Sequence, residues 1–170
     1  MVIGGIGVIA RGVVRHTDDA DATVWAPDLD ISALFRVLGE EGIRGRIPDA
    51  EEFARQNQVL LLIHEVSGVP MELSLASLPF ERDALARADH IRIDELDIPV
   101  ATAQDLVVYK TVAWRDEDRL DVERLLRLHW DAIDHADVRA RVAEFAEALD
   151  DRDRLIEFDV LLAKLNRERA

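Results

Sequence analysis

The change of pattern near Pro99 is the feature that most restricts what this chain can fold into. Before Pro99, short apolar runs alternate with turn signals and with short amphipathic stretches, which is typical of strands and helices that share one core. After it, the chain is strongly charged and helical in character as far as Asn166, and no strand pattern follows. We therefore expect an α+β fold, with a small mixed sheet flanked by helices in a core at 1–98 and a helical region at 99–170.

Three segments are expected to build the sheet. Thr17–Trp25 alternates well enough for a strand and is followed by Pro27. Val59–Ile63 and Pro70–Leu75 flank Ser67–Gly68 and predict a hairpin. The remaining expected elements are a strand end running into a glycine turn at Val2–Gly5, a helix opened by Gly7–Gly12, a third strand or edge at Ile91–Ile93, and helices at Asp30–Glu41, Asp49–Gln56, 102–114, 117–129, 135–149 and 152–167.

Composition excludes several classes of function. The 170 residues contain no cysteine, which removes disulfides, thiolate metal sites and cysteine nucleophiles, and fits a cytoplasmic location. The 21 basic and 35 acidic residues give a net charge of −14, which disfavours nonspecific binding to nucleic acid or to an anionic membrane. No apolar run approaches the ~20 residues that span a bilayer, so we expect no membrane partner.

The glycines near the start match a dinucleotide-binding pattern only loosely. Gly5, Gly7 and Ala10 are spaced as in that fingerprint, and Asp28 follows at about the distance of a ribose-binding acid. A doubly wound fold needs further strand–helix–strand units, which the second half does not supply. A glycine turn is the simpler interpretation.

Acidic residues in the expected strands are the better candidates for chemistry. Asp19 and Asp21 are two residues apart, so in a strand they point to the same face, together with Arg15 and Thr17. Two carboxylates on one face repel unless a cation lies between them. Magnesium is commonly held by one or two carboxylates together with substrate phosphates. A solvated acidic surface is the alternative.

Glu72 is a single acid inside an otherwise apolar strand. Such a carboxylate needs a partner or a ligand, unless it lies on an edge strand and faces water. If its strand lies beside that of Asp19 and Asp21, three carboxylates converge.

The helical region offers a second group of candidates. Lys110 lies in a largely apolar helix, so it either extends to solvent or reaches an anionic partner. Arg115 follows, and Asp118 and Asp121 share one face of the next helix. A solvated, salt-bridged helix start, with acids near the positive end of the helix dipole, is the alternative for this group.

In combination, these segments resemble the nucleotidyltransferases of the DNA polymerase beta superfamily, in the branch of minimal bacterial enzymes and AbiEii-type toxins. The resemblance rests on a glycine pair followed by Asp-x-Asp, and on a helical Lys followed by an Arg…Asp-x-x-Asp helix start. It covers residues 3–128. The residues that carry it are Gly4, Gly5, Arg15, Thr17, Asp19, Asp21, Lys110, Arg115, Asp118 and Asp121.

The resemblance implies an enzyme that moves a nucleoside monophosphate from a nucleoside triphosphate to an acceptor. Asp19 and Asp21 would hold Mg²⁺ or Mn²⁺, and Glu72 stands where the family usually places a third, aspartate ligand. Gly4 and Gly5 would let the backbone approach the triphosphate. Arg15 and Arg115 would contact phosphate, and Thr17 would belong to the same nucleotide-binding group. Lys110 and Asp121 would serve the nucleotide or acceptor end of the site. The acceptor stays open between tRNA, protein and a small molecule.

Two functions remain in competition. In the first, the chain is an active transferase, such as the toxin of a toxin–antitoxin pair, and an RNA acceptor would use a local basic patch. The candidates for that patch are Arg11, Arg15, Arg44 and Arg46. In the second, the fold is catalytically degenerate and serves interaction with an antitoxin or a second copy. An apolar stripe in the tail could serve such contacts, although packing within the chain is its simpler explanation. The stripe consists of Ile133, Phe145, Leu149, Leu155, Phe158 and Leu162.

Overall fold

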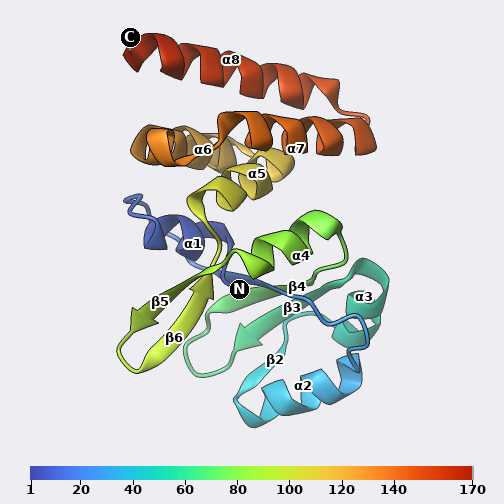
Figure 1. The fold of residues 1–170 in the computed structure, drawn as a ribbon. Coiled ribbons are helices and arrows are strands. Elements are labelled where there is room, and N and C mark those ends of the chain that lie inside the picture. Colours follow the sequence, from blue (N-terminus) through green and yellow to red (C-terminus); the bar gives the residue numbers. More distant parts are fainter. Residues whose placement is uncertain (170) are drawn as a thin grey trace. The chain divides into compact units, whose positions relative to one another are not determined.

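The computed structural model describes residues 1–169, apart from the side chain of Ile93, and has an α+β architecture (Figure 1). The chain forms two compact units. The first contains Met1–Gly7 and Arg15–Ala101, and the second contains Val8–Val14 and the chain from Thr102 onward. The expected fold class, a small mixed sheet with helices followed by a helical region, is confirmed.

The first unit is built on a four-stranded mixed sheet with the strand order β1-β4-β3-β2. Its strands are β1 (Ala20–Val24), β2 (Ile43–Gly45), β3 (Val59–His64) and β4 (Pro70–Leu75). β1 runs parallel to β4, and the other pairs are antiparallel. The expected hairpin is present as β3–β4. Both of its strands lie inside the sheet, so Glu72 does not lie on an edge strand.

One face of the sheet carries a buried apolar cluster, and the opposite face is mixed. Helices α2 (Ile31–Glu40) and α3 (Ala50–Asn57) pack against the apolar face. The buried cluster there consists of Ala54, Leu60, Leu62 and Leu75. Because side chains alternate along a strand, Leu61 and its register partner Glu72 belong to the opposite face. This opposite face carries Asp21 and Glu72 together with apolar residues of β3.

The N-terminal residues join this sheet to a second, two-stranded one. β5 (Asp89–Ile93) pairs antiparallel with β6 (Leu96–Val100). Val2 forms isolated bridges to Ala22 of β1 and to Val100 of β6. The backbone N–H of Ile3 also donates to the carbonyl of Asp21 at 2.9 Å. The start of the chain is thus fixed beside β1.

Several boundaries differ from expectation. α1 (Gly4–Ala10) begins at the glycine pair and not at Gly7, and β1 begins at Ala20 and not at Thr17. Thr17 instead donates its hydroxyl hydrogen to the carboxylate of Asp19 at 2.7 Å, a local bond that competes with a strand ladder. The sequence patterns also missed β2, β6 and α4 (Pro79–Ala86). In α4, the Glu81 side chain accepts hydrogen bonds from two backbone N–H groups at the helix start.

The second unit is helical, as expected. It contains α5 (Ala103–Ala113), α6 (Asp116–His129), a short 3₁₀ turn (Trp130–Ala132), α7 (His135–Ala148) and α8 (Arg152–Arg169). The expected cap of α5 is present, with the Thr102 hydroxyl accepting from the Asp105 N–H at 3.1 Å. Ile133 and Phe158 of the predicted apolar stripe are buried, whereas Leu149 is 53% exposed. No helix among residues 1–169 is both long and apolar enough to cross a membrane.

Replacing Leu60 by Ala tests the apolar face of the sheet. Leu60 is fully buried in the cluster under α2 and α3, and a cavity at such a site costs about 2–5 kcal/mol of unfolding free energy. Val66→Ala is the control, because Val66 is 89% exposed and its loss should change stability by less than about 0.5 kcal/mol. Urea denaturation measures both. Equal stability of the two variants would contradict this placement of the core.

Candidate active site

The parallel pairing of β1 with β4 brings two predicted site residues side by side. Asp21 is the register partner of Glu72, so the two belong to the same face of adjacent strands. Asp19 directly precedes β1, is exposed, and accepts the hydrogen bond from Thr17. The strands of Asp21 and Glu72 are therefore adjacent, as the sequence-based condition required, whereas Asp19 lies just outside β1.

The glycine pair lies directly against this group. Gly4 has a φ of +58°, and a Cβ atom added there would lie 1.9 Å from Oδ2 of Asp21. A Cβ added at Gly5 would lie 2.4 Å from Oγ1 of Thr17. Both distances are shorter than Cβ contacts in proteins, so any larger residue at either position would force the Asp21 or Thr17 side chain to shift. The backbone at the start of α1 thus approaches these two side chains closely.

Arg46 compensates the charge of Glu72. Its Nη2 donates to Oε1 of Glu72 at 2.5 Å, and both side chains are partly exposed. The backbone N–H of Arg46 donates to the carbonyl of Leu61, the residue paired with Glu72 in the β3–β4 register. This ladder bond positions Arg46 next to the carboxylate. Sequence analysis proposed Arg46 for an RNA-binding patch only, because its distance of 26 residues from Glu72 gives no local signal.

The donor set fits a metal ion that arrives with a phosphate ligand. Asp19 and Asp21 offer carboxylate oxygens, the ligands that Mg²⁺ takes together with substrate phosphates. Glu72 is bonded to Arg46. Within the described part of the chain, no three His, Asp or Glu side chains form a group that could hold a metal by themselves. The residues that would hold the ion are thus Asp19 and Asp21, with phosphate oxygens completing its coordination.

The second unit contains a buried ionic cluster. Nζ of Lys110 lies 2.7 Å from Oδ1 of Asp118 and 3.3 Å from Oδ2 of Asp121. The exposed fractions of these three side chains are 9%, 0% and 2%. Of the two sequence alternatives, Lys110 therefore reaches anionic partners and does not extend to solvent. The expected salt bridges at this helix start are present, but Asp118 and Asp121 are buried and not solvated.

Asp118 also caps its own helix. Its Oδ2 accepts hydrogen bonds from the backbone N–H and from Nε of Arg115, each at 3.0 Å. Burial raises the pKa of the Asp118 carboxyl, but the hydrogen bond and charge of Lys110, with the Arg115 contacts, outweigh burial and hold that pKa below its ordinary value. Asp118 is therefore ionised at neutral pH. From the sequence, Asp118 was expected at a helix start with Asp121, but its capping bonds to Arg115 were not predicted, although its place in the first helical turn was a signal for capping.

The predicted site residues thus fall into two groups, one in each unit. The structure brings together Gly4, Gly5, Thr17, Asp19, Asp21 and Glu72 in the first unit. Arg15, in the same unit, donates from Nε to the carbonyl of His16 at 3.0 Å. Lys110, Arg115 and Asp121 belong to the second unit with Asp118. The assignment of Lys110 and Asp121 to the nucleotide or acceptor end stays a prediction, and their contacts within the second unit are those of a buried ion cluster.

Comparison of the chain with models of protein families gives no match, and comparison with the curated proteins gives none.

Replacing Gly4 by Ala tests the close approach to Asp21. The variant should lose roughly 2 kcal/mol or more of unfolding free energy, because left-handed backbone costs about 1–2 kcal/mol for Ala and the new methyl must displace Asp21. Gly42→Ala is a matched control, since Gly42 also has a left-handed φ (+71°) but no atom within 4 Å of the added Cβ. Thermal denaturation compares them. Equal losses would contradict the contact.

Replacing Asp118 by Asn tests the ionic cluster. Removing one partner of a buried pair costs about 3–5 kcal/mol at neutral pH. Because the folded-state pKa is lowered, this stability is present above the ordinary carboxyl pKa of about 3.9 and is lost as the pH falls through the folded-state value. The difference between wild type and variant should therefore shrink below about pH 4.

The control is Asp116→Asn in the same helical turn, where the carboxylate is fully exposed. It should change stability by no more than about 0.5 kcal/mol. Urea denaturation from pH 3 to 7 measures both variants. A pH-independent difference for Asp118→Asn would contradict an ionised Asp118.

Proposed function

We propose that this chain is a magnesium-dependent nucleotidyltransferase that moves a nucleoside monophosphate from a nucleoside triphosphate to a hydroxyl acceptor. The observation that carries the proposal is the register of β1 with β4, which puts Asp21 beside Glu72 while the backbone of Gly4 lies against Asp21. A glycine-lined approach beside paired carboxylates suits a triphosphate and its metal ion.

In this proposal Asp19 and Asp21 hold Mg²⁺ or Mn²⁺, and Gly4 and Gly5 leave room for the triphosphate. The bound ion would offset phosphate charge and polarise the reacting oxygens. The acceptor oxygen forms a bond to the α-phosphorus as the bond to pyrophosphate breaks. Glu72 takes the proton of the acceptor hydroxyl once Arg46 has moved from the carboxylate to a phosphate oxygen. Arg46 thereby changes partner from one anion to another.

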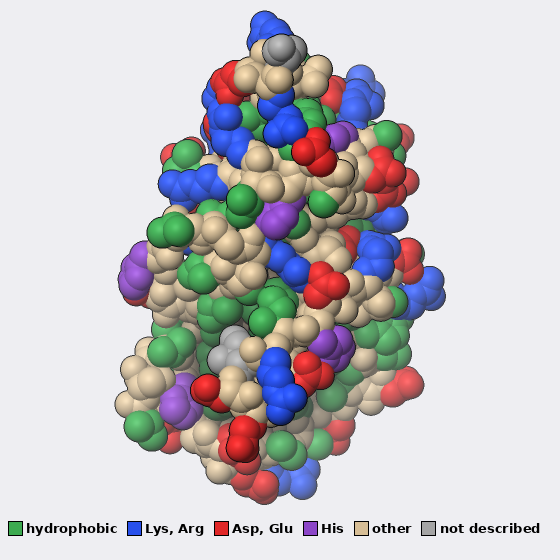
Figure 2. Space-filling model, turned by 60° about the vertical axis from the view of Figure 1, so that its left-hand side comes forward, with side chains coloured by type: hydrophobic (Ala, Val, Ile, Leu, Met, Phe, Trp, Pro, Cys, Tyr) green, Lys and Arg blue, Asp and Glu red, His purple; other side chains and the backbone are tan. Residues whose placement is uncertain are grey.

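The charge distribution favours a compact acceptor over a long nucleic acid. The guanidinium of Arg44 lies 2.9 Å from the carboxylate of Glu65, and Arg46 is bonded to Glu72. Two members of the predicted RNA patch are therefore already paired with acids of their own sheet. On the face drawn in Figure 2, acidic and basic side chains are interspersed and do not gather by sign. A protein hydroxyl, a small molecule or the end of a tRNA needs only a local site, and a toxin opposed by an antitoxin is one such setting.

The ion pair of Arg46 with Glu72 also favours a second candidate. If Arg46 holds Glu72 permanently, the third carboxylate is not available for proton transfer or metal binding. The fold would then be a catalytically degenerate nucleotidyltransferase that serves interaction with a partner protein. Nucleotide binding separates the two candidates, because it requires the site but no acceptor.

Calorimetric titration of each Mg·NTP into the wild type should reveal one preferred nucleotide. Asp19→Asn and Asp21→Asn should each weaken that binding at least about tenfold, because each removes a charged ligand of the metal. Asp18→Asn is the matched control, since Asp18 is an exposed neighbour that pairs with His16 at 2.7 Å. Its binding should equal that of the wild type.

Circular dichroism verifies that each variant is folded. Equal binding by all three variants would contradict the assigned metal ligands. A folded wild type that binds no nucleotide would overturn the proposed activity and leave the degenerate candidate.

A further inference from the structure

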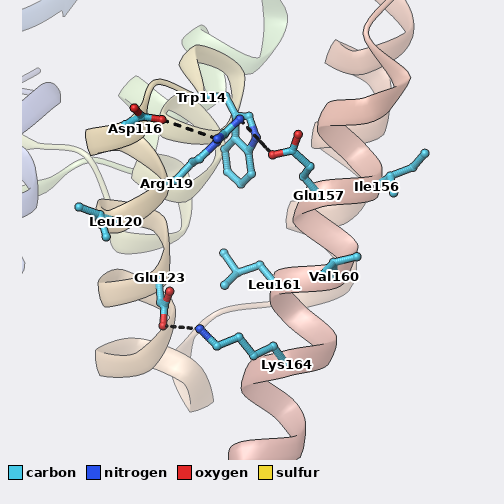
Figure 3. A pocket seen from close by; sticks show the side chains of 10 residues that line it. All are labelled: Trp114, Asp116, Arg119, Leu120, Glu123, Ile156, Glu157, Val160, Leu161 and Lys164. Atoms are coloured by element: carbon cyan, nitrogen blue, oxygen red, sulfur yellow. Dashed lines mark hydrogen bonds and ion pairs between the residues drawn. The ribbon is translucent and has the colours of Figure 1, made fainter.

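The outward face of α8 carries an apolar stripe that the fold of the second unit does not cover. Ile156 and Val160 are 59% and 63% exposed. Figure 3 shows both side chains pointing away from α6, whereas Leu161 and Lys164 point toward it. Ile156 and Val160 also belong to the lining of a hollow of about 580 Å³ between α6 and α8. The face is thus distinct from the buried face of α8, which carries Phe158 and Leu165.

The exposed positions follow the spacing of a helix–helix seam. Asp153, Ile156, Val160, Ala163 and Arg167 succeed one another at intervals of three and four residues. This is the spacing with which two helices pack along their length. The positions that flank Val160 at seven residues on either side carry opposite charges, Asp153 before it and Arg167 after it.

This charge pattern is self-complementary under a two-fold rotation. When two copies of α8 lie antiparallel and cross at Val160, Asp153 of each copy faces Arg167 of the other, so that two equivalent ion pairs form. Among residues 1–169, Asp153 has no ion-pair partner, and Arg167 donates from Nε to the carbonyl of Ala163 at 3.2 Å. In a parallel arrangement, like charges would face each other and repel. The surface therefore fits an antiparallel second copy.

We propose that the outward face of α8 is a homodimer interface in which two copies cross antiparallel at Val160. The stripe contains only two large apolar side chains, so the dimer is weak and dependent on concentration. The net charge of −14 on each copy opposes association, and physiological salt screens this repulsion. The proposal is independent of the proposed nucleotidyltransferase activity, because it uses no residue of that site.

Single cysteines test the crossing point directly, because the natural chain has no cysteine. In Val160→Cys, the two thiols meet at the two-fold axis and should form a disulfide-linked dimer under mild oxidation. Ile156→Cys is the matched control on the same face. Four residues from the axis, its Cα atoms would be separated by about 12 Å along the helices, beyond the ~7 Å limit of a disulfide. Non-reducing electrophoresis measures both.

Charge reversal is an independent test, in which sedimentation equilibrium at about 0.15 M salt measures the dissociation constant of the dimer. Asp153→Arg and Arg167→Asp should each weaken dimerisation about tenfold by creating two repulsive pairs, and the double variant should restore it. Both positions are exposed, so neither change threatens the fold. The proposal would be overturned by a monomeric wild type across the micromolar range, by cross-linking of Ile156→Cys as efficient as that of Val160→Cys, or by a double variant as weak as the singles. A monomer would leave this face to a different protein partner.

Discussion

The repulsion between two carboxylates on neighbouring strands is the constraint that governs the face of the sheet opposite the apolar cluster. The parallel register makes Asp21 and Glu72 neighbours, at the ~4.8 Å spacing of adjacent strands. Such a pair is costly unless positive charge lies close by. Arg46 supplies that charge to Glu72 at 2.5 Å, and its position depends on the backbone bond to Leu61. Burial of Leu60 and Leu62 on the other side of the sheet offsets the remaining electrostatic cost and fixes the strands in register.

The second unit also holds two carboxylates close together, but there the charges are buried and a lysine lies between them. Lys110 lies between Asp118 and Asp121 with almost no exposure of any of the three side chains. Removing these charges from water is expensive, so their value lies less in net stability than in the geometry that they require. The ammonium reaches both carboxylates across the contact between α5 and α6, so the cluster restricts how these two helices can pack.

Local signals were the part of the structure that the sequence could predict. The caps at Asp30 and Thr102 depend on atoms three residues apart, and the hairpin depends on one turn, so both could be recognised. β2 has only three residues, which is too short to show the alternation of apolar and polar residues that predicts a strand. The pairing of Arg46 with Glu72 joins residues whose neighbours carry no shared pattern. For the candidate site, Asp21 and Glu72 could be singled out from the sequence by their residue types, whereas their adjacency depends on the strand order.

The position of Arg46 in the sheet bears on whether the site can work. β2 has three residues and lies at the edge of the four-stranded sheet, whereas β4 lies inside it with a partner on each side. An edge strand is held by hydrogen bonds on one side only, so the chain near Arg46 can shift at less cost than the chain near Glu72. Partial exposure of both side chains lowers the cost of separating them further. When an anionic ligand competes for this ion pair, the arginine is therefore the partner that moves, and Glu72 keeps its place beside Asp21.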